Sequence, residues 1–388
     1  MTDSLPPLSL YVHLPWCVRK CPYCDFNSYR AESELPEAAY VDALLRDLDA
    51  ERDAANGRKV QSIYVGGGTP SLFSGDAVAR LLDGIRARVD LEPDAEITLE
   101  ANPGVADAAR FAAFREAGVN RLSIGVQSFR DAQLAALGRV HDGREAVRAV
   151  EAARRAGFAD INVDLMYGLP DDSLEAATSD VRRAIALEPT HISWYQLTLE
   201  PGTAFHRRPP ALPDDDTVLE IEAAGRDLLA SAGYERYEVS AYAKPGHRCR
   251  HNLNYWQFGD YVGIGAGAHG KLTRARGEIE RRAKARNPRT YVELAGTPAA
   301  AQIERVVGPD LVLELLMNAL RLPEGVPVSL FEARTGRSIA TIRDRIDAAV
   351  SRGWMVDDPD RLATTPRGLE LLNDVLALFV PEPVARRA

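Results

Sequence analysis

Short apolar runs of strand length alternate with longer amphipathic segments through the first half of the chain. In the amphipathic segments apolar residues recur every three or four positions, as Leu44, Leu45 and Leu48 do, which is typical of a helix packed on a core. The runs predict strands at 8–13, 62–65, 97–99, 122–126, 161–165 and 192–197, and the segments predict helices at 37–54, 77–89, 108–117, 144–156 and 174–187. Strands that alternate with helices indicate parallel βα units. We therefore predict an α/β fold with a partial (β/α)6 barrel, and an open doubly wound sheet is the alternative.

The pattern changes after about residue 204 and again near residue 306. The first change brings a loop at 209–216, a helix to about 232, a strand at 237–242, a stretch rich in glycine and histidine to 270, and a basic exposed loop or helix at 271–290. The second brings helices at 310–322, 330–335 and 339–352, a hairpin around Pro359 and a last helix at 368–379. These elements indicate a winged-helix-like α+β domain. The predicted domains are a barrel at 1–204, an extension of it at 205–300 and the winged-helix-like domain at 301–388.

The net charge of the 388-residue chain is −9, which disfavours a general affinity for nucleic acid or anionic membranes. From Arg305 onward, twelve acidic residues face eleven arginines and no lysine, so we expect this domain to pack or contact proteins rather than bind DNA. No apolar run of about 18 residues predicts a membrane span, and the first residues lack the pattern of a signal peptide. We expect a cytoplasmic protein whose thiols stay reduced.

Three of the four cysteines, Cys17, Cys21 and Cys24, stand within eight residues directly after the first predicted strand. One interpretation is that they are small buried core residues. A second is a zinc site, but zinc needs a fourth ligand, and Cys249 lies far along the chain. The third is an iron–sulfur cluster on three thiolates, which leaves one iron open to another ligand, as a catalytic metal requires.

The spacing C-x3-C-x2-C, with an aromatic residue just before the last cysteine, resembles the signature of the radical S-adenosylmethionine (SAM) family. The resemblance implies a [4Fe-4S] cluster on Cys17, Cys21 and Cys24, whose open iron is chelated by the amino and carboxylate groups of SAM. It also implies that the reduced cluster can cleave SAM to a deoxyadenosyl radical.

Glycines and polar residues follow the predicted strands, and the carboxyl ends of parallel barrel strands meet at one face. Each is a weak signal alone: the glycines can form a tight turn, and Glu100 can be an acid at a helix start. In order, they resemble the oxygen-independent coproporphyrinogen III oxidase (HemN) subfamily over about residues 8–270. The resemblance implies that SAM is bound by Tyr11, Gly67, Gly68, Thr69, Glu100, Gln127, Arg139 and Asp164.

Two departures from the oxidases resemble the sister group, the HemW heme chaperones. Phe26 stands where the oxidases have a further cysteine, and only 16 residues precede Cys17. The motif H-N-x-x-Y-W at 251–256 also resembles that group. The resemblance implies a chaperone without coproporphyrinogen oxidase activity, which passes heme to apo-hemoproteins of the respiratory chain. It is compatible with a homodimer and with transient membrane contact.

The H-N-x-x-Y-W motif has the chemistry to hold a porphyrin. The imidazole of His251 is a good axial ligand for iron, and Tyr255 and Trp256 offer flat apolar surface. The residues just upstream can add a second axial ligand or pair with propionates; they are His247, Arg248, Cys249 and Arg250. The alternative is a core Tyr–Trp pair with a hydrogen-bonded histidine and asparagine. The resemblance favours heme binding by His251, Asn252, Tyr255 and Trp256.

Two other functions remain open from the sequence. One is a true oxidase, which decarboxylates two propionates of coproporphyrinogen III to give protoporphyrinogen IX, with deoxyadenosine and methionine as co-products. The other is a DNA-binding protein that uses the winged-helix-like domain.

Overall fold

Six parallel strands lie side by side in chain order, β1–β4–β5–β6–β7–β8. The computed structural model describes residues 5–32, 34–55, 57–105 and 107–381. The strands are β1 (Leu8–Leu14), β4 (Val60–Gly67), β5 (Leu91–Ala101), β6 (Arg121–Gln127), β7 (Asp160–Tyr167) and β8 (His191–Gln196). A doubly wound sheet reverses its strand order at a switch point, and this order never reverses. The partial (β/α)6 barrel is therefore confirmed, and the open doubly wound alternative is wrong.

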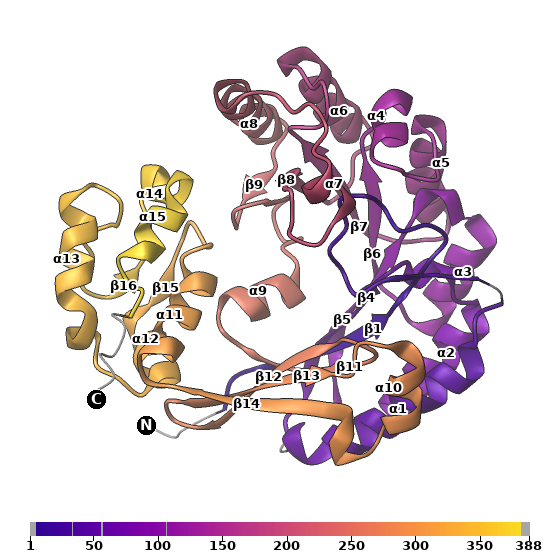
Figure 1. The fold of residues 1–388 in the computed structure, drawn as a ribbon, viewed down its shortest axis with the longest axis horizontal. Coiled ribbons are helices and arrows are strands. Elements are labelled where there is room, and N and C mark those ends of the chain that lie inside the picture. Colours follow the sequence, from indigo (N-terminus) through magenta and orange to yellow (C-terminus); the bar gives the residue numbers. More distant parts are fainter. Residues whose placement is uncertain (1–4, 33, 56, 106, 382–388) are drawn as a thin grey trace.

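Helices form an outer layer along the convex side of these strands (Figure 1). They are α1 (Glu37–Ala55), α2 (Gly75–Arg86), α3 (Ala108–Ala117), α4 (Asp131–Ala136), α5 (Gly143–Arg155), α6 (Leu174–Ala186) and α8 (Asp215–Ser231). The short helix α7 (Ala204–Arg207) lies outside this layer, and the backbone N–H of Phe205 donates to the carbonyl of Pro22 at 3.0 Å. Their starts follow local sequence signals. Asp142 and Glu145, for example, cap the backbone at the start of α5 in a reciprocal pair, which satisfies amide groups that the first helical turn leaves unpaired. The strand residues Leu10, Val12 and Ile63 are buried between the sheet and this layer.

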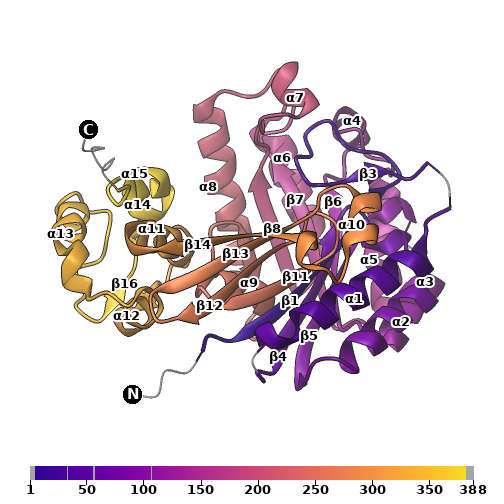
Figure 2. The ribbon, with the colours of Figure 1, turned by 60° about the horizontal axis from the view of Figure 1, so that its bottom comes forward.

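The sheet continues beyond both edges of the barrel, and Figure 2 shows the strands that extend it beyond β1. Beside β1 lie β11 (Asp260–Ile264), β12 (His269–Ala275), β13 (Glu278–Lys284) and β14 (Ala301–Val307). Beside β8 lie β10 (Ala241–Ala243) and β9 (Glu235–Arg236). The continuous strand predicted at 237–242 is therefore wrong, because a bend separates two shorter strands there.

The prediction of an exposed loop or helix at 271–290 is also wrong. This segment holds β12, β13 and the start of α10 (Pro288–Leu294). Its basic residues suggested exposure, but Lys271 is buried and pairs with Asp260 at 2.8 Å. Lys284 is buried too and pairs with Asp47 at 2.6 Å. Burying a charge is tolerated when it is paired in this way, so a basic sequence can form interior strands.

The C-terminal part has a hydrophobic core of its own, around Leu315, Phe331 and Phe379. Its elements are α11 (Gly308–Ala319), β15 (Val326–Pro327), α12 (Val328–Thr335), α13 (Arg343–Ser351), β16 (Arg361–Leu362), α14 (Pro366–Glu370) and α15 (Leu372–Ala377). The hairpin around Pro359 is present, with a bridge between Met355 and Thr364. β16 pairs with β15. The single last helix predicted at 368–379 is wrong, since α14 and α15 are separate helices.

Helix α9 (Arg250–Trp256) lies between the barrel and the C-terminal helices (Figure 1). It contacts β1 and β4 on one side and α11 on the other. Leu253 and Trp256 pack against the C-terminal core. Because α9 joins the two parts and β11–β14 extend the barrel sheet, the three-domain division of the chain stays a prediction. No helix among the described residues has both the length and the apolar character needed to cross a membrane.

Candidate functional site

The three clustered cysteines lie on one loop that leaves the carboxyl end of β1. Cys17 ends the short strand β2 (Trp16–Cys17), which pairs with β3 (Tyr29–Arg30), and Cys21 and Cys24 lie in the loop between them. The loop is held by Lys20, whose amine donates to the carbonyls of Phe26 and Ser28 at 2.9 and 3.3 Å. Burial raises the pKa of the Cys17 and Cys24 thiols.

All three thiols line one cavity of about 460 Å³, here called the cluster cavity. The carboxyl ends of the barrel strands complete its wall, as the parallel arrangement predicts. Seven of the residues predicted to bind SAM line it as well: Gly67, Gly68, Thr69, Glu100, Gln127, Arg139 and Asp164. Tyr11 does not line the cluster cavity and lies instead in a neighbouring one.

Gly67 and Gly68 lie where the chain passes closest to β1 and β2. Gly67 has a φ of +117°, and a Cβ there would be 2.6 Å from the ring of His13. A Cβ on Gly68 would be 2.5 Å from the carbonyl oxygen of Trp16. Only glycine fits both places. The tight-turn interpretation is therefore correct for Gly67, and both glycines allow the cysteine loop to pack directly on this turn.

Glu100, at the end of β5, is a buried carboxylate with two donors. It accepts hydrogen bonds from the hydroxyl of Tyr64 and, at 3.0 Å, from the backbone N–H of Gly67. Burial raises the pKa of Glu100 to about 7, with a further contribution from the charge of Asp164. This carboxylate is therefore poised to change its charge near neutral pH.

Arg139 brings a positive charge to the cysteine loop. Its guanidinium donates to the carbonyl of Gly125 at 2.6 Å and approaches the sulfur of Cys21 at 3.8 Å. Its Nε is buried and has no hydrogen-bond partner among the described residues. Gln127, with a φ of 69°, accepts from the hydroxyl of Tyr195 at 2.8 Å. Asp164 accepts from Ser123 and Asn162 at 3.0 and 2.7 Å.

The residues of the cluster cavity fit an iron–sulfur cluster, which the three thiolates would hold, and a SAM molecule. Three thiols from one loop face the cavity, and the fourth cysteine, Cys249, is not among the residues that line it. Polar groups for a ligand beside the cluster come from three side chains. They are the unpartnered Nε of Arg139 and the carboxylates of Glu100 and Asp164. Bound SAM would supply the source of a deoxyadenosyl radical.

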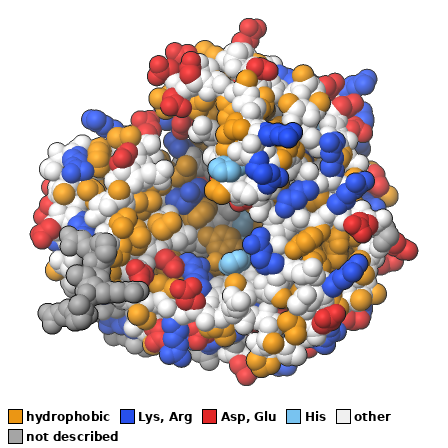
Figure 3. Space-filling model, in the orientation of Figure 1, with side chains coloured by type: hydrophobic (Ala, Val, Ile, Leu, Met, Phe, Trp, Pro, Cys, Tyr) orange, Lys and Arg blue, Asp and Glu red, His pale blue; other side chains and the backbone are white. Residues whose placement is uncertain are grey.

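A second cavity, of about 720 Å³, adjoins the first and is here called the aromatic cavity. Its aromatic lining consists of Tyr11, Phe26, Tyr64, Tyr255, Trp256, Phe258 and Tyr261. Its basic and imidazole lining consists of His13, His269, Lys271, Arg281 and Arg286. Tyr64, Gly67 and Glu100 line both cavities, so the two share a wall. Figure 3 shows a hollow on this face in the region of α9, with hydrophobic side chains in its depth and histidine and basic side chains at its border.

The H-N-x-x-Y-W motif is divided between the aromatic cavity and the interior. Tyr255 and Trp256 line the cavity, and the indole N–H of Trp256 is buried without a partner among the described residues. His251 and Asn252 do not line it. The side chain of Asn252 donates to the hydroxyl of Tyr237 at 3.2 Å.

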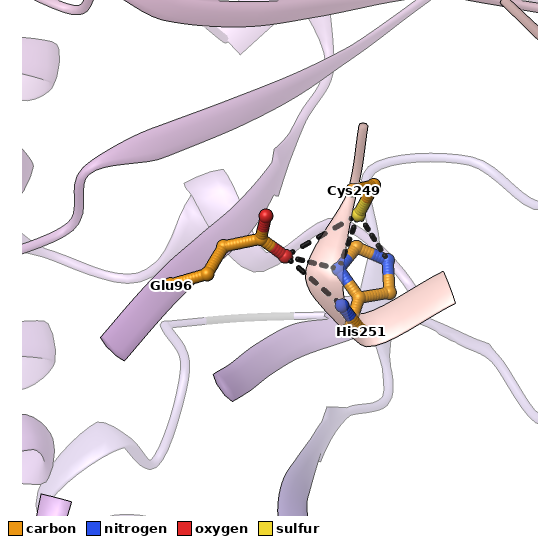
Figure 4. A group of neighbouring side chains, drawn as sticks. All are labelled: Glu96, Cys249 and His251. Atoms are coloured by element: carbon orange, nitrogen blue, oxygen red, sulfur yellow. Dashed lines mark hydrogen bonds and ion pairs between the residues drawn. The ribbon is translucent and has the colours of Figure 1, made fainter. Parts of the chain in front are cut away.

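His251 points to Glu96 and Cys249 inside the barrel (Figure 4). Its Nδ1 lies 2.9 Å from a carboxylate oxygen of Glu96 and 2.8 Å from the sulfur of Cys249. Glu96 also accepts from the backbone N–H groups of Arg250 and His251 at 3.0 and 3.2 Å, which anchors the start of α9. Burial alone would raise the pKa of Glu96, but the hydrogen bond and charge of His251, the charge of Arg121 and the backbone N–H of Arg250 together lower it.

The residues upstream of His251 are engaged elsewhere. His247 lies 2.5 Å from Asp160, and Arg248 pairs with Glu324 at 2.8 Å. Arg250 pairs with Asp94. None of these residues, nor Cys249, is among those that line the aromatic cavity.

Sequence reasoning missed several residues that line the aromatic cavity. Tyr64 lies inside a predicted strand, and Arg281 and Arg286 lie in the segment predicted as a loop or helix. His269 follows a glycine-rich stretch with no pattern to mark it. A pairing of β12 with β13 would have revealed His269 and Arg281, because it places their side chains on one face, but nothing local in the sequence specifies that pairing. Tyr64 and Arg286 lie outside these two strands.

Comparisons with known proteins agree with this geometry. The model of the Radical SAM superfamily matches residues 11–183, and that of the HemN C-terminal domain matches residues 308–371. The heme chaperone HemW of Escherichia coli (strain K12) is 52% identical over 98% of this chain and 100% of that protein. The heme chaperone HemW of Haemophilus influenzae is 49% identical over 98% of this chain and 99% of that protein.

A solved structure shows the same fold. Coproporphyrinogen III oxidase (HemN) from Escherichia coli, a radical SAM enzyme, superposes with a TM-score of 0.82 over 97% of this chain and 90% of that chain, at 23% identity. Membership of the superfamily implies a [4Fe-4S] cluster and SAM, consistent with the cluster cavity. On its near-complete match to the curated relatives, this chain belongs to the HemW family of the radical SAM superfamily.

Proposed function

We propose that this protein is a heme chaperone, which binds heme in the aromatic cavity and passes it to apo-hemoproteins of the respiratory chain. The relatives named heme chaperones match nearly the whole chain at 52% and 49% identity. The structural similarity to coproporphyrinogen III oxidase extends to the fold alone, at 23% identity. The comparisons therefore favour the chaperone over the oxidase.

The aromatic cavity is the observation that supports this proposal most strongly. Its volume of about 720 Å³ lies within the range of small-molecule sites, about 300–1,000 Å³. Heme is a flat, largely apolar ring with two carboxylates at its edge. Tyr255 and Trp256 offer aromatic faces to the ring, and Arg281 and Arg286 supply positive charge for the carboxylates.

The cluster cavity adjoins the proposed heme site, so a ligand in the cluster cavity can influence heme binding. We propose that Cys17, Cys21 and Cys24 hold the [4Fe-4S] cluster and that Glu100, Arg139 and Asp164, with the glycine turn, hold SAM. Occupation of the cluster cavity would act on the heme through the shared wall. Tyr11 would then contact heme or the wall rather than SAM directly.

The role predicted for His251 as an axial ligand stays a prediction. Its imidazole faces Glu96 and Cys249, so ligation of a heme in the aromatic cavity would require the side chain to turn. In the proposal, His251 and Asn252 hold α9 in place so that Tyr255 and Trp256 form the cavity wall.

Heme titration of the anaerobically reconstituted protein tests the proposal, with absorbance in the Soret region as the readout. A saturable band at one heme per chain supports it, and the absence of specific binding would reject it. The oxidase alternative has its own test in the same sample. Formation of protoporphyrinogen IX from coproporphyrinogen III, with deoxyadenosine and methionine, would favour the enzyme.

The proposal has consequences for location and assembly. We place the protein in the cytoplasm, with transient membrane contact when the acceptor is a membrane hemoprotein, and with a homodimer as an assembly state. Flotation with lipid vesicles and sedimentation, each with and without heme, test these points.

A further inference from the structure

His269 and His13 are the two histidines that line the aromatic cavity. The imidazole of His13 is fully engaged. Its Nε2 lies 2.9 Å from the carbonyl oxygen of Asn27, to which it must donate, and its Nδ1 then accepts from the hydroxyl of Tyr11 at 2.7 Å. His269 is exposed at the start of β12, and its ring has no hydrogen-bond partner among the described residues.

The pairing of β12 with β13 explains why His269 faces the cavity. His269 lies opposite Ala283, and Lys271 lies opposite Arg281. Residues two apart on a strand, and residues opposite one another on paired strands, share a face of the sheet. His269, Lys271 and Arg281 therefore stand on one face, and all three line the aromatic cavity.

The basic residues of the cavity differ in how far they are already paired. Lys271 is bound to Asp260 at 2.8 Å. The guanidinium of Arg281 is bound to Glu314 and, at 3.0 Å, to the hydroxyl of Tyr261. Arg286 is exposed, and the contact made by its guanidinium is a hydrogen bond of 3.4 Å to the side chain of Asn27. Arg286 is thus the cavity arginine that can pair with a new carboxylate at least cost.

We propose that His269 is the axial ligand of the heme iron and that Arg286 pairs with a heme propionate. This inference rests on the proposed function, since it assigns the residues that hold the cargo. An imidazole without a competing partner is suited to bind iron, and a guanidinium to bind a carboxylate. The aromatic side chains deeper in the cavity would then contact the macrocycle.

The experiment compares ferric heme with iron-free protoporphyrin IX, because only heme can form an axial bond. We expect His269→Ala to weaken heme binding about tenfold or more and to shift the Soret band, with little effect on protoporphyrin IX. We expect Arg286→Ala to weaken both ligands by about tenfold, as the loss of a charged hydrogen bond predicts. His206→Ala, in α7 outside the cavity, is the matched control and should bind both ligands as the wild type does.

A second variant distinguishes loss of the axial ligand from loss of folding. His269→Cys should bind heme with the spectrum of a thiolate-ligated ferric heme, which a merely structural role could not produce. If His269→Ala and His269→Cys keep the wild-type heme spectrum and affinity, the inference is wrong while the proposed function stands. If the wild-type protein binds no heme, both the proposed function and this inference are wrong. If His251→Ala alone abolishes the axial signal, the ligand is His251 and the inference is overturned.

Discussion

The imidazole of His251 packs against the phenol ring of Tyr64, with their ring centroids 4.0 Å apart. The hydroxyl of Tyr64 donates in turn to the carboxylate of Glu100, which lines both cavities. Glu96 also holds His251, with a carboxylate oxygen 2.9 Å from its Nδ1. The start of α9 is therefore joined, through two rings, to the carboxylate between the cluster cavity and the aromatic cavity.

The first prediction concerns the pH dependence of SAM binding. Burial raises the pKa of Glu100 to about 7, whereas the Tyr64 hydrogen bond lowers it. If the carboxylate binds the ribose hydroxyls of SAM, affinity should rise as the pH passes through about 7 and Glu100 ionises. Tyr64→Phe should move this rise to higher pH, because the ionised form loses a donor.

Calorimetric titration of the reconstituted protein with SAM over a pH series measures this effect. Glu100→Gln is the control, since it carries no charge to titrate, and it should bind SAM with a flat profile over the same range. A rise that persists in Glu100→Gln would assign the effect to another group.

The second prediction concerns the buried charges that support the extended sheet. Lys284 pairs with Asp47 and Glu51 at 2.6 and 2.7 Å, and all three side chains are at most 5% exposed. Lys284→Met should lower the free energy of unfolding by about 3–5 kcal/mol, because Asp47 and Glu51 stay buried without the ammonium group. Asp47 then keeps its hydrogen bond from Tyr291, and Glu51 keeps its pair with Arg282. Urea denaturation of the full chain measures it.

The matched control for Lys284→Met is Arg80→Met. The pair of Arg80 with Asp42 is about half exposed, and we expect a loss below about 1 kcal/mol. Equal losses in the two variants would contradict a structural role for the buried cluster of charges.

The third prediction concerns the glycine turn beneath the cysteine loop. A Cβ at Gly68 would lie 2.5 Å from the carbonyl oxygen of Trp16, the residue before Cys17. Since a backbone atom cannot move aside cheaply, Gly68→Ala should displace β2 and reduce the iron content after reconstitution. Gly233→Ala, after α8, has nothing within 4 Å but a φ of +81°. It therefore introduces backbone strain away from the cysteine loop and should keep its iron. Full iron content in Gly68→Ala would show that the loop tolerates the shift.

The fourth prediction separates the cysteines by role. Cys21→Ser should lose most of the bound iron and sulfide, because a three-thiolate cluster has no spare protein ligand. Cys249→Ser should retain them, since Cys249 contacts Glu96 and His251 rather than the cluster cavity. Iron and sulfide analysis checks both variants. Loss of the cluster in Cys249→Ser would contradict this separation.

The barrel was predictable because its signals are local. Each βα unit carries an apolar run and an amphipathic helix, and parallel strands then bring residues such as Glu100 and Asp164 to one face without further information. The cysteine spacing marks a site in the same way, within eight residues.

The extension of the sheet was not predictable from such signals. The strands β12 and β13 contain Lys271 and Lys284, whose partners Asp260 and Asp47 are supplied by tertiary structure. For the same reason, the orientation of His251 away from the aromatic cavity could not be foreseen. Its direction depends on Glu96, which lies 155 positions away in the chain.

The most direct test of the central claim is the position of the heme iron in crystals of the heme-bound protein. Anomalous scattering at the iron edge locates iron atoms without assumptions about the surrounding chain. The account predicts one group of peaks at Cys17, Cys21 and Cys24 and a separate peak in the aromatic cavity, beside Tyr255 and Trp256. A heme iron peak outside that cavity, such as one at Glu96, Cys249 and His251, would contradict it.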